Sequence, residues 1–266
     1  EKVRSFFVNE IMERGFKKLP KSLQRCYDPQ FFFQEYYDKK AAKAIPKNSD
    51  LLVAWSSAAL HTIRAAKKRN IPTLVERGSS HIQFQQAILQ EEYNRLGLAP
   101  PITHHPKTIE KELQEYQEAD YLCVPSQYVA RTMIEKNIPA EKIIQIPYGV
   151  DPTYFNPLPK EDTVFRVIFA GNACIRKGVH YLLQAFSELN LPNAELWLIG
   201  TQAPEIRPFI EKFATSNVHC KGPFPEFELA KYYAQGSVFC LPSIEEGLAM
   251  VQLQAMACAL PVICTT

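Results

Sequence analysis

Two segments of the 266-residue sequence place charged residues directly after a strand-like run and before a helical pattern. The first, residues 169–178, presents Arg176 and Lys177 at the start of a helix. Because unpaired backbone N–H groups and cations converge there, this segment predicts an anion site. The second, residues 241–263, presents Glu246 at the start of another helix. Two plainer interpretations stay open: a polar surface loop for the first segment, and a carboxylate favoured by the helix dipole for Glu246.

A further polar side chain follows Glu246 at helical spacing. Gln254 lies eight residues later, and eight positions at about 3.6 residues per turn return to nearly the same face of a helix. In open α/β sheets, ligands bind where strands end and helices begin. We therefore expect Glu246 and Gln254 to address one pocket at the carboxyl edge of a sheet.

Strand-length apolar runs alternate with helical patterns along most of the chain, which is typical of βαβ units and parallel sheets. The segment 147–159 holds four prolines and can continue neither a helix nor a strand, so the domain boundary is placed there. The prediction is two α/β domains, residues 1–150 and 151–266. No strand–turn–helix unit opens the first and no helix closes the second, so we expect a chain truncated at both ends. The predicted strands are 50–55, 71–75, 121–124, 142–146, 165–170, 194–199, 218–221, 238–241 and 261–264, and the predicted helices are 57–68, 82–96, 107–118, 126–136, 177–188, 204–214, 227–234 and 249–257.

Composition and motif spacing exclude several classes of protein. With 46% hydrophobic and 22% charged residues the chain can form a core, so disorder is excluded. Its seven cysteines include no Cys-x-x-Cys pair, which indicates reduced thiols in a soluble, cytoplasmic protein. No apolar run reaches the roughly 18 residues of a membrane span. The ten glycines form neither Gly-x-Gly-x-x-Gly nor a P-loop, which leaves a Rossmann-type reductase as a weak alternative.

Metal and nucleic-acid sites are not predicted. The sequence has no zinc-ligand spacing and no basic strand with interleaved aromatic residues, and His104 and His105 are interpreted as loop histidines. Residues 1–77 hold 16 Lys or Arg against 8 Asp or Glu. This surplus is compatible with an anionic partner such as the inner face of a membrane, although solvated helix ends are the plainer explanation.

Taken together, these segments resemble the retaining glycosyltransferases of family 4, a group with the GT-B fold within glycosyl transferases group 1. The pattern Pro-Ser-x-x-Glu-Gly at 242–247, with the helix after it, is similar to that family's Glu-x7-Glu signature. Residues 171–178 are similar to its Gly-Arg-x-x-x-x-Lys-Gly phosphate loop. Residues 146–155 resemble its interdomain linker, and 119–127 its last N-domain strand. The likeness covers residues 50–266.

The resemblance implies two Rossmann-like domains that face each other across a cleft, with the nucleotide sugar on the C-terminal domain and the acceptor on the N-terminal one. It implies transfer of a sugar from a UDP- or GDP-sugar to a hydroxyl of a lipid, polysaccharide or small glycoside, with no metal and no cofactor. Lys177 is expected to hold the diphosphate and Glu246 to contact the donor sugar. The residues expected to act in catalysis are Glu246, Lys177, Arg176 and His81, and those expected to bind the donor are Gly171, Asn172, Gly178, Gly247, Leu248, Ala249, Met250 and Gln254.

Three positions depart from the family pattern. The second Glu of the signature, which contacts the nucleotide ribose in the family, is Gln254 here and supplies no charge. The Arg of the phosphate loop falls on Asn172, which leaves Arg176 as the replacing cation. Many relatives place a His at the end of the N-domain strand that lies within 73–81. Here Glu76 and Arg77 lie near that point and His81 lies a few residues later, so the residue that takes this place stays open, as does a core or loop role for His81.

Gln254 and Asn172 also keep open a second function, that of a non-catalytic protein of the same fold that binds sugar nucleotides. The charge logic favours the enzyme, because fixed cations and helix N–H groups stabilise the negative charge that develops on a leaving diphosphate. On this interpretation, alanine at Lys177 or Glu246 costs far more activity than alanine at Glu245.

Overall fold

The computed structural model describes residues 14–15, 30–99, 105–213 and 215–265. The chain divides into two compact units. Unit 1 contains residues up to 84 together with 101–146, and unit 2 contains 85–100 together with 147–266.

Unit 1 is built on a parallel sheet with the strand order β1-β2-β3-β4. Its register pairs Val75 of β2 with Leu122 of β3, and both side chains are fully buried in an apolar cluster with Ile63, Ile82 and Met133. The predicted strands and helices from residue 50 onward are present with boundaries shifted by a few residues. The elements are α3 (Gln30–Ala44), β1 (Leu52–Trp55), α4 (Leu60–Lys67), β2 (Thr73–Glu76), α5 (Ile82–Arg95), α6 (Pro106–Glu118), β3 (Tyr121–Val124), α7 (Gln127–Glu135), η1 (Ala140–Lys142) and β4 (Ile143–Gln145).

Helix α3 was not predicted from the sequence. Its only fully buried side chain is Asp38, so it lacks the apolar stripe that hydrophobic periodicity detects. The Asp38 carboxylate accepts hydrogen bonds from the backbone N–H groups of His61 and Thr62, both at 2.9 Å. Helix α3 is therefore held against the start of α4 by a buried carboxylate. The spacing of apolar residues in the sequence gives no signal for a helix that is held in this way.

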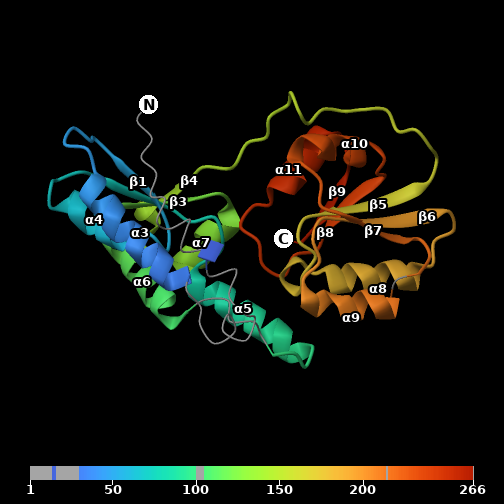
Figure 1. Ribbon diagram of the computed structural model, residues 1–266, viewed down its shortest axis with the longest axis horizontal. Helices are drawn as coiled ribbons and strands as arrows, with labels where there is room; N and C mark the ends of the chain where they lie inside the picture. Colours follow the sequence, from blue (N-terminus) through green and yellow to red (C-terminus); the bar gives the residue numbers. More distant parts are fainter. Residues whose placement is uncertain (1–13, 16–29, 100–104, 214, 266) are drawn as a thin grey trace. The chain divides into compact units, whose positions relative to one another are not determined.

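Unit 2 contains a second parallel sheet, with the strand order β7-β6-β5-β8-β9. Helices α8 and α9 lie on one face of this sheet and α10 and α11 on the other (Figure 1). The chain runs outward from β5 to β6 and β7, and then returns to the other side of β5 with β8, so the strand order reverses between β5 and β8. The elements are β5 (Phe165–Ala170), η2 (Ile175–Lys177), α8 (Val179–Leu189), β6 (Ala194–Ile199), η3 (Pro204–Ile206), α9 (Arg207–Phe213), β7 (Val218–Gly222), η4 (Glu226–Glu228), α10 (Leu229–Ala234), β8 (Val238–Leu241), α11 (Met250–Ala257) and β9 (Val262–Cys264).

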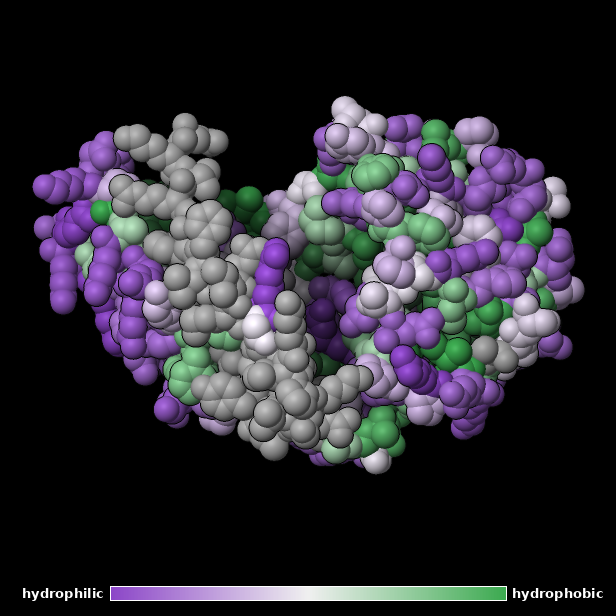
Figure 2. Space-filling model, in the orientation of Figure 1, coloured by the Kyte–Doolittle hydropathy of each residue, from purple (hydrophilic) through white to green (hydrophobic). Residues whose placement is uncertain are grey.

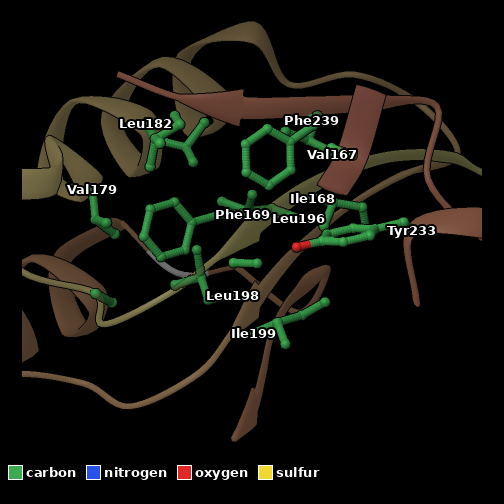
Figure 3. Packing of buried hydrophobic residues seen from close by; sticks show 14 of the residues in the cluster. Val167, Ile168, Phe169, Val179, Leu182, Leu196, Leu198, Ile199, Tyr233 and Phe239 are labelled. Atoms are coloured by element: carbon green, nitrogen blue, oxygen red, sulfur yellow. The ribbon is translucent and has the colours of Figure 1, made fainter. Parts of the chain in front are cut away.

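A single apolar cluster fills the interior of unit 2. Strand residues such as Phe169 and Leu196 and helix residues such as Val179 and Tyr233 belong to it (Figure 3). Helix α8 contributes Val179, Leu182, Leu183 and Phe186, which are all buried in this cluster. Burial of such side chains contributes roughly 1.5–3 kcal/mol each, which gives the sheet a rigid edge on which to carry loops.

All of α5 except residues 82–84 belongs to unit 2, which the predicted boundary at residue 150 did not anticipate. Tyr93 is buried in the apolar cluster of unit 2, with Leu96 and Leu98 packed against it. Glu92 is also buried and lies 3.0 Å from the Nε2 atom of His180 in α8. Apolar burial and this polar pair explain why residues 85–100 join the C-terminal unit although they lie early in the chain.

The visible surface of unit 2 is a mosaic of hydrophilic and hydrophobic residues (Figure 2). Scattered apolar side chains of this kind are normal on protein surfaces. Among the described residues, no helix combines the length and the apolar character needed to cross a membrane.

Candidate functional site

The two segments singled out in the sequence follow neighbouring strands of unit 2. Residues 171–178 follow β5 and residues 242–249 follow β8, and β5 pairs with β8 in parallel. Both segments therefore leave the sheet at its carboxyl edge, at the point where the strand order reverses. In open α/β sheets this reversal point is where ligands bind.

Backbone contacts hold the two segments together. The N–H of Ile244 donates to the carbonyl of Arg176 at 2.8 Å. Gly178 approaches the backbone of Pro242 so closely that a Cβ atom would lie 1.8 Å from the Pro242 carbonyl oxygen. Gly178 also has φ +65°, a conformation that side chains disfavour. This position therefore requires glycine for both conformation and space.

A second close approach shapes the start of the loop after β5. A Cβ atom at Gly200 would lie 2.0 Å from the carbonyl oxygen of Gly171. Asn172 follows, and its Oδ1 accepts a hydrogen bond from the hydroxyl of Thr201 at 2.9 Å. At the position of the family's Arg, this chain thus has an exposed amide tied to the loop after β6.

The charged side chains of both segments form a compact cluster. The Nζ atom of Lys177 contacts Oε2 of Glu246 as an ion pair. A guanidinium nitrogen of Arg176 lies 3.2 Å from the Glu245 carboxylate and 4.0 Å from that of Glu246. The structure therefore brings Arg176, Lys177 and Glu246 together, as the sequence predicted, and adds Glu245.

Glu245 has a different environment from Glu246. Its side chain is fully buried, and besides Arg176 it accepts a hydrogen bond from Nε2 of Gln85 at 2.8 Å. Removing one partner of a buried charge pair leaves the other charge without compensation. The structure therefore changes the expectation for Glu245→Ala, which we now predict to lower folding stability and to release Arg176.

Lys177 is largely withdrawn from water, and this alters its acidity. Burial is the main cause that lowers the pKa of Lys177 from 10.5 to about 8, and the neighbouring Arg176 guanidinium lowers it too. A lysine held in this way keeps its charge near neutral pH but loses it more easily than a surface lysine does. An incoming anion would favour the charged form.

The backbone after Glu246 turns into α11 without a side-chain cap. Ala249 is the N-cap residue and makes no side-chain hydrogen bond, and Gly178, the N-cap of α8, makes none either. The first N–H groups of two helices therefore face the same edge of the sheet as the charged cluster. The remaining predicted donor-binding residues, Gly247, Leu248, Ala249 and Met250, form this turn.

Gln254 lies within α11 and is buried. With Met250 it lines a cavity of about 640 Å³ whose lining also includes Tyr154, Phe227 and Glu226. Glu246 is not among the described residues that line this cavity. Glu246 precedes the start of α11 at Met250, so helical periodicity does not extend to it, and that the two residues address one pocket stays a prediction.

His81 belongs to unit 1, whereas Arg176, Lys177 and Glu246 belong to unit 2. Its side chain is 1% exposed, and its Nδ1 accepts a hydrogen bond from the N–H of Gln83 at 3.2 Å. Burial first, and then the charge of Arg77, lower the pKa of His81 to about 4, so the ring is neutral near pH 7. Its ring lies 5.1 Å from that of Tyr116. These contacts are those of a core histidine.

Unit 1 also contains a cluster that the sequence did not reveal. Ligand-type atoms of Glu35, Asp38 and His61 lie within 4.8 Å of one another. The ammonium group of Lys111 is 3.1 Å from Glu35 and 2.9 Å from Asp38. The ammonium group of Lys111 thus already lies beside both carboxylates, where a metal ion would bind. The sequence did not reveal the cluster, because His61 and Lys111 are too far from Glu35 and Asp38 in the chain to show a ligand spacing.

The C-terminal part of the chain is similar to known glycosyltransferases. Residues 164–266 match the family model "Glycosyl transferases group 1". The chain is 29% identical over 153 residues to the MMP alpha-(1->4)-mannosyltransferase of Mycolicibacterium hassiacum, covering 55% of this chain and 37% of that protein. It is 26% identical over 166 residues to the alpha-galactosylglucosyldiacylglycerol synthase of Streptococcus pneumoniae, covering 55% of this chain and 44% of that protein. The match thus spans less than half the length of these two relatives.

Solved structures resemble a larger part of the chain. Sucrose-phosphate synthase from Thermosynechococcus elongatus superposes with a TM-score of 0.65 at 20% identity, covering 88% of this chain and 60% of that one. HepE from Anabaena, determined in complex with UDP and glucose, gives a TM-score of 0.65 at 17% identity, covering 85% of this chain and 62% of that one. At such identities the likeness concerns the fold. Residues 164–266 therefore match glycosyl transferases group 1, and the chain has the α/β architecture of the GT-B glycosyltransferases.

Proposed function

We propose that this protein is a glycosyltransferase that moves a sugar from a UDP- or GDP-sugar to an acceptor hydroxyl, and that unit 2 binds the donor. The observation that carries the proposal is the ion pair of Lys177 and Glu246, beside Arg176, at the reversal point of the sheet. The family match of residues 164–266 supports it, as does the structural likeness to HepE, which was determined in complex with UDP and glucose.

In the proposed mechanism the cations act on the leaving group. The diphosphate takes the ammonium of Lys177 away from Glu246 and also contacts Arg176 and the uncapped N–H groups of α8 and α11. Negative charge that develops on the diphosphate as the sugar–phosphate bond breaks is then stabilised by groups already in place. Glu246, released from Lys177, accepts hydrogen bonds from hydroxyls of the donor sugar.

No metal or cofactor has a part in this proposal, and no side chain is assigned as a nucleophile. The departing phosphate oxygen takes the proton of the acceptor hydroxyl on the face that the phosphate leaves, so the product retains the configuration of the donor. The anomeric configuration of the product, determined by NMR, tests this step. An inverted product would contradict it.

The acceptor is proposed to bind on unit 1, and its class is left as lipid, polysaccharide or small glycoside. The name of the Streptococcus pneumoniae relative, a galactosylglucosyldiacylglycerol synthase, supports a lipid among these. The basic surplus in residues 1–77 supports peripheral contact of a cytoplasmic enzyme with an anionic membrane. Co-sedimentation with vesicles that contain or lack anionic lipid tests this contact.

A non-catalytic protein that binds sugar nucleotides is the second candidate. It is favoured by Asn172 at the place of the family's Arg and by the uncharged Gln254. The deciding experiment incubates the full chain with UDP- and GDP-sugars, records the melting temperature, and measures nucleotide release and sugar transfer. Turnover supports the enzyme. A preparation that is stabilised by a nucleotide sugar and never consumes it, with acceptors of all three classes present, supports the second candidate.

A further inference from the structure

A cavity beside α11 combines an apolar wall with polar side chains. Its volume is about 640 Å³, within the usual range of small-molecule sites. Aromatic and apolar side chains, Tyr154, Phe155, Phe227 and Met250, form much of its wall. Two polar side chains, Glu226 and Gln254, stand among them. An apolar wall suits the flat face of a nucleotide base. The two polar side chains would then form hydrogen bonds with the sugar or with the edge of the base.

Gln254 is already engaged by protein groups. Its side chain is 3% exposed, its Nε2 donates to Oε1 of Glu226 at 2.8 Å, and its Oε1 accepts from the hydroxyl of Tyr233 at 3.3 Å. The amide is thereby fixed in one orientation. Both polar atoms of the Gln254 amide thus have protein partners, and one of these partners is Glu226.

Glu226 differs from Gln254 in exposure and charge. It is exposed, it lines the cavity, and Gln254 binds only one of its two carboxylate oxygens. The other carboxylate in the wall is Asp151, whose Oδ1 accepts from both the N–H and the hydroxyl of Thr153 in its own turn, at 2.9 and 2.7 Å. Glu226 is therefore the carboxylate of this cavity that is best placed to meet a ligand.

We propose that Glu226 binds the vicinal diol of the nucleotide ribose, and that Gln254 is a positioning residue that holds Glu226. This inference rests on the proposed function, because it takes a nucleoside diphosphate as the ligand. A ribose presents two hydroxyl donors side by side, and a carboxylate accepts both with charge-assisted hydrogen bonds. The charge that position 254 lacks is thus supplied from η4, 28 residues earlier in the chain.

The first test compares UDP with 2′-deoxy-UDP on the full chain by calorimetry. The wild type is expected to bind UDP about tenfold more tightly than the deoxy analogue, the size of one hydrogen bond to a charged group. Glu226→Gln is expected to weaken UDP binding about tenfold and to bring the ratio of the two affinities close to one. Glu228→Gln, two residues away and outside the cavity wall, is the matched control and keeps the wild-type ratio.

The second test exchanges the charge between the two positions. Gln254→Glu alone places two carboxylates where the structure has a 2.8 Å hydrogen bond, so UDP binding is expected to weaken. The double variant Glu226→Gln with Gln254→Glu restores an amide–carboxylate pair and is expected to regain the preference for UDP over the deoxy analogue. Melting temperatures of all variants confirm that folding is intact.

Three results would overturn the inference while leaving the proposed function standing. These are a wild type that binds UDP with no preference over the deoxy analogue, an unchanged affinity ratio in Glu226→Gln, and tighter UDP binding in Gln254→Glu. If Glu226→Gln instead weakens GDP but not UDP, the carboxylate recognises a guanine edge and the diol assignment is wrong. If the wild type binds neither UDP nor GDP, the proposed function fails and the inference fails with it, which the wild-type measurement alone reveals.

Discussion

Helix starts in the two units are completed in different ways. In unit 1, the Glu115 carboxylate accepts hydrogen bonds from the N–H groups of Ala59 and Leu60 at the start of α4, at 2.8 and 3.1 Å. The hydroxyl of Ser126 caps α7 at 3.3 Å. In unit 2, α8 and α11 begin at Gly178 and Ala249 with no side-chain cap. In unit 1, carboxylates and hydroxyls of the protein thus accept hydrogen bonds from the first N–H groups of these helices. In unit 2, the N-cap residues of α8 and α11 provide no such acceptor, and the two helix starts lie beside Arg176 and Lys177.

Under the proposed function, this difference separates a structural use of charge from a ligand-binding one. Glu115 is fully buried and satisfied within the protein, so little is gained there by a ligand. Arg176 and Lys177 remain partly accessible, and under the proposed function a diphosphate displaces Glu246 from Lys177. The predictions below test whether the two kinds of helix start respond differently to substitution.

The largest effect is expected at Gly178. Gly178→Ala brings a methyl group against the Pro242 carbonyl and should lower the free energy of unfolding by more than about 4 kcal/mol or abolish folding. Gly97→Ala is the matched control, because Gly97 has the same φ of +65° with no atom within 4 Å of an added Cβ. It should cost about 1 kcal/mol. Urea denaturation measures both, and equal losses would show that the close approach to Pro242 contributes nothing.

The next largest effect is expected at the start of α4 in unit 1, where Glu115 accepts hydrogen bonds from backbone N–H groups. Glu115→Ala leaves the N–H groups of Ser57, Ala59 and Leu60 without their carboxylate, which should cost about 3 kcal/mol of stability. Glu118→Ala removes a carboxylate of the same helix that pairs with Arg64 in partly exposed surroundings, and should cost about 0.5 kcal/mol. Similar losses in denaturation would remove the distinction between the two units.

At the start of α8 in unit 2, substitution should weaken nucleotide binding and leave folding stability nearly unchanged. Lys177→Ala should weaken UDP or GDP binding about 30-fold, or about 2 kcal/mol, with a melting temperature close to that of the wild type. Lys212→Ala removes an exposed lysine at the end of α9 and should leave the affinity unchanged. Titration calorimetry decides, and equal affinities in both variants would show that Lys177 does not meet the nucleotide.

The sequence predicted the strands of unit 2 closely, because each is an apolar run bounded by turn residues. β5, β6 and β8 have the predicted boundaries. The sequence also indicated that Lys177 and Glu246 meet, because both follow strands at one edge of a sheet. It could not reveal the hydrogen bond of Gln85 to Glu245, whose partners lie 160 residues apart. Nor could it show that Glu226 stands beside Gln254, because that pairing depends on how η4 packs on α11.

The smallest effect concerns the pH dependence of nucleotide binding. In the folded protein the pKa of Lys177 is about 8, so its ammonium is mostly charged at pH 7 and mostly neutral at pH 9.5. A diphosphate binds the charged form, so affinity should fall as the pH rises through 8, by about tenfold between pH 7.5 and 9.5. Lys177→Arg keeps its charge over this range, because guanidinium groups do not deprotonate there.

The arginine variant should therefore bind UDP or GDP with a flat profile above pH 7.5, even if its affinity at neutral pH is somewhat lower. Both profiles are obtained by calorimetry at constant ionic strength, because screening would otherwise weaken the binding of a charged ligand as well. A decline of the same size in both proteins would assign the titration to another group. Lys177 would then not be the group whose charge governs nucleotide binding, and the proposed difference between the helix starts of the two units would lose its support.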